Sequence, residues 1–147
     1  MKGIKMSDCK FYVDEDARVI VCVIPETEDI LRDFIVEHFQ WSDINVEWAL
    51  GYNFCKRLQM PYSFMGKAVC APEDEWNEAL GKKIAFACAK DKCYKSFFKR
   101  ANLLVQTIDR RLGDMIEAFN DFGLKLDAKR EALESQIESE TKKEGDA

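Results

Sequence analysis

Residues 82 to about 140 contain no proline, and this constrains the fold more than any other feature of the sequence. Helix-forming residues dominate the stretch, and its apolar side chains recur three or four positions apart, as they do along one face of a helix. The apolar series is Ala101, Leu104, Ile108, Leu112, Met115, Phe119, Phe122, Leu126, Leu133 and Ile137. The spacing is heptad-like with one empty turn near Lys129, and it predicts a long amphipathic helix.

A single helix of about 40 residues extends about 60 Å at 1.5 Å per residue. The remainder of a 147-residue chain is too small to cover a stripe of that length, so the helix needs a partner. We expect the partner to be the same helix of a second copy. The alternative is that the chain folds back on itself at Gly123. The end from 141 to 147 is charged and poor in apolar groups, so we expect it to fray.

The part of the chain before residue 82 carries strand and short-helix patterns instead. Two β-rich runs flank an acidic turn within residues 10–25, which predicts a β-hairpin. An alternating run between Pro61 and Pro72 predicts a third strand. We also expect a helix over about 27–39 and a short helix with a loop within 40–60.

The acidic residues over 73–75 suit the start of a further helix within 73–81, where Gly81 either breaks the turn or lets a neighbour approach closely. The predicted fold class is therefore α+β, with a small antiparallel β-sheet, short helices and a long C-terminal oligomerising helix. We expect one domain over 1–140, in which 1–81 form the sheet and short helices and 82–140 form the long helical region. The frayed tail of 141–147 follows it.

The sequence lacks the motifs of the common enzyme and metal-binding classes. It has no phosphate-binding loop of the GK[ST] type, no GxGxxG and no HExxH, so we expect no catalytic residues and no cofactor. It has six cysteines but no CxxC pair and only one histidine, His38, so we expect free thiols and no metal site. No apolar run is long enough for a membrane span, and the N-terminal residues do not resemble a signal peptide, which predicts a cytoplasmic protein with no membrane partner.

Charge is distributed unevenly along the chain. The net charge is −7 over residues 1–81, +7 over 82–111 and −5 over 112–147. We call residues 82–111 the basic belt. Because the whole chain is acidic, a long nucleic acid is not the partner we expect, and a local site for a small anion explains the belt better.

Cationic, aromatic and amide side chains are interleaved in the second half of the belt. Lysine and arginine bind phosphate oxygens, aromatic rings stack on bases, and Asn, Gln and Thr can hydrogen-bond to ring edges. The candidate ligand-binding residues are Lys92, Lys95, Phe97, Phe98, Lys99, Arg100, Asn102, Gln106, Thr107, Arg110 and Arg111. The alternative is that the cations form an ordinary helix surface or pair with the acidic flanks, and that the aromatic rings belong to the core.

The segments FMGKAVCAPEDEW at 64–76 and GKKIA at 81–85 carry a resemblance to small proteins of Firmicutes phages and mobile elements. Within residues 62–90 the chain resembles the phage Thoeris anti-defence proteins of the first described type. Members of that family combine an N-terminal sheet with long helices and act as sponges, binding cyclic ADP-ribose isomers and in some cases cyclic oligonucleotides without cleaving them, as dimers or hexamers. The resemblance implies that residues 92–111 of the belt, together with Arg57 and Lys67, surround a cyclic nucleotide at a subunit interface.

We therefore expect a non-catalytic anti-defence protein that sequesters a cyclic nucleotide immune signal as a homo-oligomer. One alternative is a protein inhibitor of the anti-CRISPR type, whose acidic residues 1–81 mimic nucleic acid and cover a basic groove. Another is a structural coiled-coil accessory protein, which binds no ligand and only associates through its helix.

Overall fold

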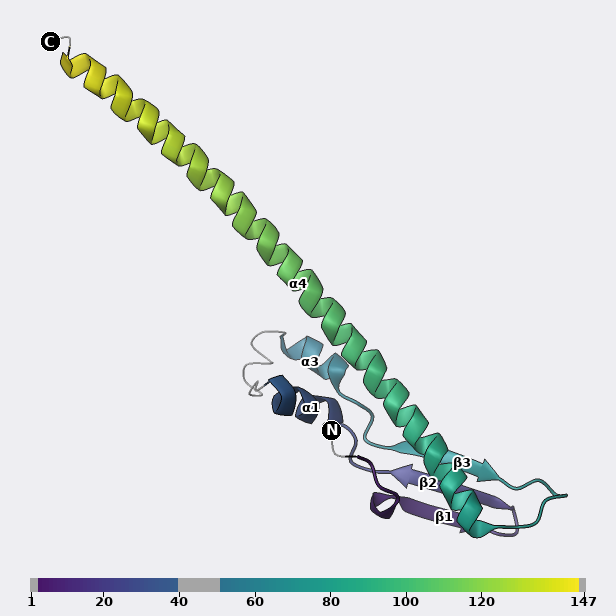
Figure 1. Ribbon diagram of the computed structural model, residues 1–147. Helices are drawn as coiled ribbons and strands as arrows, with labels where there is room; N and C mark the ends of the chain where they lie inside the picture. The colour runs from purple at the N-terminus through teal and green to yellow at the C-terminus, as the bar shows by residue number, and fades with distance from the viewer. Residues whose placement is uncertain (1–2, 40–50, 146–147) are drawn as a thin grey trace. The chain divides into compact units, whose positions relative to one another are not determined.

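The computed structural model describes residues 3–39 and 51–145, and the chain forms two compact units, Met1–Leu104 and Val105–Ala147 (Figure 1). The first unit holds the whole β-sheet and the short helices. The second unit is formed by the C-terminal part of the long helix. None of the helices in the described part combines the length and the apolarity that crossing a membrane requires.

The sheet has three antiparallel strands in the order β1 (Lys10–Asp14), β2 (Val19–Ile24) and β3 (Phe64–Val69). A tight turn joins β1 to β2. The Asp14 carboxylate accepts a hydrogen bond from the Ala17 backbone N–H at 2.8 Å, and Arg18 takes a positive φ of 56°. The α+β fold class is confirmed, including the hairpin and the third strand.

In the described residues between β2 and β3 the chain forms the short α-helices α1 (Ile30–Phe39) and α3 (Tyr52–Leu58), and a 3-10 helix, η1 (Met6–Asp8), precedes β1. The helix that was expected from about residue 27 begins three residues later. The reason is that buried Thr27 donates its hydroxyl proton to the Pro61 carbonyl at 2.5 Å and its backbone N–H to the Tyr62 carbonyl at 3.0 Å. Helix α3 matches the short helix expected within 40–60, whereas residues 40–50 lie outside the described part.

The long helix α4 spans Glu78–Gly145. Its first turn is capped by Asn77, whose side-chain oxygen accepts the Leu80 backbone N–H at 2.9 Å. The expectation of a helix start at residues 73–75 is wrong, because these acidic residues belong to the loop before the cap. The fold-back at Gly123 is also wrong, because α4 continues through that residue, and it extends over 141–145 of the expected tail.

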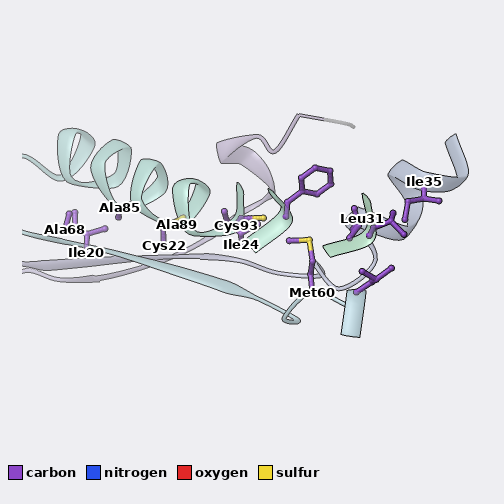
Figure 2. Close-up of a cluster of buried hydrophobic side chains, with 13 residues drawn as sticks. Ile20, Cys22, Ile24, Leu31, Ile35, Met60, Ala68, Ala85, Ala89 and Cys93 are labelled. Atoms are coloured by element: carbon purple, nitrogen blue, oxygen red, sulfur yellow. The ribbon is translucent and has the colours of Figure 1, made fainter. Parts of the chain in front are cut away.

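Small residues let α4 approach the sheet closely in the first unit. Figure 2 shows Ala85, Ala89 and Cys93 of α4 beside Cys22 and Ala68 of the sheet, and all five are buried. At Gly66 of β3 there is no room for a side chain, since a Cβ there would clash with the backbone of Ala85 and Ala89. The glycine and alanine pattern is therefore what places the helix on this face.

A second part of the core joins α1 and α3 to α4. Leu31 and Ile35 of α1 are buried with Leu58 of α3 and with Met60 just after it. The Phe97 ring of α4 is only 8% exposed in the same cluster. These contacts hold α1 and α3 against the part of α4 that carries the first half of the candidate site.

Candidate functional site

All of the candidate residues in the basic belt lie on α4, but they fall in both compact units. The first unit holds Lys92, Lys95, Phe97, Phe98, Lys99, Arg100 and Asn102, and the second holds Gln106, Thr107, Arg110 and Arg111. The structure thus places the whole series on one helix.

Two lysines of the belt are already engaged within the chain. The Lys92 ammonium donates to the Met65 carbonyl of β3 at 2.9 Å, and the Lys95 ammonium forms an ion pair with the Asp91 carboxylate at 2.6 Å. Lys99 is exposed and has no hydrogen bond or ion pair with any described residue. Of Lys92, Lys95 and Lys99, Lys99 is therefore the one most available to an outside anion.

Arg100 connects two helices of the first unit. Its Nε donates to the Gln59 carbonyl at 2.8 Å, directly after α3 ends, and its Nη1 donates to the Ser96 hydroxyl at 2.5 Å. Arg100 is half-buried, and its charge-assisted hydrogen bonds stabilise the arrangement of the two helices. Arg100 therefore positions α3 against α4, a role that the sequence pattern did not predict.

The aromatic residues of the belt divide between core and surface. Phe97 packs edge-on against Phe34 of α1, with ring centroids 5.4 Å apart. Phe98 is 62% exposed and meets the Phe97 ring edge-on at 5.7 Å. Among the non-aromatic candidates, Thr107 of the second unit is also buried. Phe98 remains available for stacking on a ligand, whereas Phe97 serves the core.

A concave feature of the first unit lies beside α3. An open hollow of about 400 Å³ is lined by Gly51, Tyr52, Asn53, Phe54 and Arg57. The Lys56 ammonium lies 4.6 Å from the centre of the exposed Tyr52 ring. The hollow thus combines two aromatic rings, an amide and a guanidinium, which are the groups that bind a phosphorylated base.

Of the two residues that the resemblance added to the belt, the structure brings only one to this hollow. Arg57 lines it, and Arg100 holds the end of the same helix. Lys67 does not join them. It alternates with Gly66 and Ala68, which face α4, so its side chain extends from the opposite face of the sheet. Sequence reasoning missed Tyr52, Asn53 and Phe54, although aromatic, amide and basic residues within two helical turns are a signal that could have identified them.

Two loops that carry acidic residues, the β1–β2 turn and the loop after β3, lie at the same end of the sheet (Figure 1). Residues 14–16 lie at the end of β1 and in the turn that follows it, residues 73–75 lie in the loop after β3, and all six are exposed. Arg18 joins the two segments by donating to the Cys70 thiol at 3.0 Å and to the Asp74 carbonyl. The two acidic segments are thus linked through Arg18 on the first unit.

Three thiols in the first unit are held in their protonated form. Burial raises the pKa of Cys22 to about 12, and the neighbouring Cys9 adds to this effect. Burial also raises the pKa of Cys9 and of Cys93. These three groups are therefore poor nucleophiles at neutral pH. The described residues contain no group of three His, Cys, Asp or Glu side chains placed to hold a metal ion.

The segments that carry the family resemblance serve the fold in this structure. The absence of a side chain at Gly66 lets α4 pack closely on β3, and Cys70 accepts the Arg18 hydrogen bond. A Cβ at Gly81 would lie 2.6 Å from the Ile20 side chain, so this glycine also allows close packing. Comparison with known proteins finds no matching family model, curated protein or solved structure. The geometry of the hollow and the belt is thus the basis for assigning a function.

Proposed function

We propose that the protein is a non-catalytic binding protein that captures a small phosphate-bearing ligand of the cyclic-nucleotide class and releases it unchanged. In the setting that the family resemblance implies, it is a phage anti-defence protein. It acts in the host cytoplasm as a homo-oligomer, where it removes a cyclic nucleotide signal from an immune pathway. The observation that carries the proposal is the hollow beside α3, in which Arg57 lies with two aromatic rings and an amide.

The chemistry of the hollow favours such a ligand. A guanidinium donates two parallel hydrogen bonds to phosphate oxygens, and the exposed Tyr52 ring in the hollow is available for stacking on a base. The Asn53 amide can both donate to and accept from a base edge. Exposed Lys99 adds positive charge to the same unit. Binding of this kind needs no nucleophile and no general base.

A capture experiment tests the proposal. The full chain is mixed with cyclic mononucleotides, cyclic dinucleotides and cyclic ADP-ribose isomers, separated from unbound ligand by gel filtration, and then denatured by heat. We expect mass spectrometry of the supernatant to find one of these cyclic nucleotides intact. Release of a hydrolysed product would instead indicate an enzyme, and release of nothing would contradict the proposal.

A second candidate function is favoured by the acidic end of the sheet. The six exposed carboxylates of residues 14–16 and 73–75 could cover a basic surface of a target protein, as an inhibitor of the anti-CRISPR type does. The engagement of Lys92 and Lys95 within the chain also fits this candidate, since it leaves fewer cations for a ligand. This candidate would be supported if the protein captured no nucleotide and if substitutions that neutralise these carboxylates abolished its inhibition of the target protein.

A further inference from the structure

The second compact unit exposes a row of large apolar side chains along α4. In a heptad frame they occupy the positions that form the seam of a coiled coil. The a positions are Val105, Leu112, Phe119, Leu126 and Leu133, and the d positions are Ile108, Met115 and Phe122, followed by Lys129 and Gln136. All eight apolar members are exposed, Phe119 to 70%. Burying them requires another polypeptide.

We propose that this face pairs with the same face of a second copy, and that the two helices run antiparallel. The inference rests on the homo-oligomer of the proposed function and adds its geometry. In the register that keeps the apolar layers together, Phe119 packs on the partner's Phe122. Leu126 then packs on the partner's Met115, and Leu133 packs on the partner's Ile108. Each layer repeats by symmetry, so the pairing buries the seam along its whole length.

Charge disfavours the parallel arrangement. In a parallel pair in register, Lys129 at a d position would face the partner's Lys129 inside the seam. In addition, Lys125 at a g position would face the partner's Arg130 at an e position, and this contact would occur twice. Like charges so placed are unfavourable, most of all where an apolar seam removes water.

The antiparallel arrangement removes both conflicts and adds an attraction. Two e positions then face one another, which brings Asp109 to the partner's Arg130, twice in each dimer. Lys129 lies beside the partner's Leu112, where its long stem can reach the solvent.

The shape of the face favours the same arrangement. Ile116 at another e position is 54% exposed, and it comes opposite the partner's Gly123. No atom lies within 4 Å of the place where a Cβ of Gly123 would be, so the large side chain meets an open site.

A charge-exchange cycle tests the orientation on the full chain. The variants are Asp109→Arg, Arg130→Asp and the double variant, and sedimentation equilibrium gives the dissociation constant of each. We expect each single variant to raise the constant about ten-fold, because two attractions per dimer become repulsions, and the double variant to restore it within about three-fold. Asp114→Arg makes the same charge change at an outward c position and is expected to leave the constant unchanged.

A further variant separates the two orientations directly. In a parallel pair, position 125 faces the partner's Arg130, so Lys125→Glu would tighten the dimer. In an antiparallel pair, position 125 faces the partner's Ala118, so the substitution is expected to leave the dissociation constant unchanged. Tightening by Lys125→Glu, or failure of the double variant to recover, would overturn the antiparallel arrangement while leaving the oligomer in place. A wild-type chain that sediments as a monomer would overturn both the inference and the proposed oligomer, and the capture experiment would still decide ligand binding.

Discussion

The two parts of α4 use opposite kinds of side chain. Where it packs on the sheet in the first unit, the helix buries small residues, and Ala85 and Ala89 are completely inaccessible. In the second unit it exposes large ones, of which Phe119 is 70% and Leu124 is 69% accessible. Small residues allow backbones to approach, so that part of the helix is stabilised by its own chain. Large exposed residues gain stability only when another surface covers them.

Substituting Gly66 tests the first half of this comparison and has the largest expected effect. Gly66→Ala introduces a methyl group that must displace the backbone of Ala85 and Ala89, so we expect the free energy of unfolding to fall by about 3 kcal/mol. Urea denaturation followed by circular dichroism measures it. Gly113→Ala is the matched control, because nothing lies near Gly113 on the exposed helix, and it is expected to raise stability by about 1 kcal/mol. Equal effects of the two substitutions would remove the distinction between the units.

Alkaline pH tests the same packed interface without altering its shape. The pKa of Cys22 is about 12 in the folded protein and 9.0 in the unfolded chain, so the folded state holds this proton more tightly. The contribution of the protonated Cys22 thiol to the free energy of unfolding is complete below pH 9 and is lost as the pH rises toward 12. Between pH 9 and about 10.5 the expected loss is about 2 kcal/mol, at 1.36 kcal/mol per pKa unit.

Cys22→Ala provides the control for the alkaline effect. The variant keeps the site apolar but has no thiol to titrate, so its stability is expected to change less over the same pH range. Urea midpoints measured at intervals from pH 8 to 10.5 compare the two proteins. Parallel profiles for wild type and variant would show that the buried thiol is not the source of the pH dependence.

The start of α4 is expected to show the smallest effect. Asn77→Ala removes the side-chain acceptor of the Leu80 N–H and should lower the free energy of unfolding by about 1 kcal/mol. Asn77→Asp retains an acceptor oxygen and is expected to preserve the stability. If the alanine and aspartate variants were equally stable, the cap would contribute nothing and packing alone would fix the start of the helix.

The sequence predicts the fold better than the site, for physical reasons. Alternation and helical periodicity depend on local geometry, which is why the hairpin, the third strand and the long helix were foreseen. The acidic residues at 73–75 resemble a helix start, but long-range hydrogen bonds from Arg18 fix them in a loop. Such bonds leave no local periodicity to detect.

The candidate site depends even more on contacts between distant segments. Lys92 bonds to a strand 27 positions earlier, and Arg100 bonds to a carbonyl 41 positions earlier, so their availability cannot be read from α4 alone. Phe97 has the pattern of a stacking residue, yet α1 covers it. The hollow lies beside α3, whose end bonds to Arg100, and of its lining residues only Arg57 was expected, through the family resemblance.

The most direct test of the account is isothermal titration of the full chain with the cyclic nucleotide that the capture experiment returns, for wild type, Arg57→Ala and Lys10→Ala. Arg57 lines the hollow, whereas Lys10 is an exposed lysine on β1, so the two substitutions each remove one surface cation. We expect the dissociation constant to rise about 10- to 100-fold for Arg57→Ala, because a charge-assisted hydrogen bond to phosphate is lost, and to stay unchanged for Lys10→Ala. Wild-type affinity in Arg57→Ala would contradict the assignment of the hollow as the ligand site.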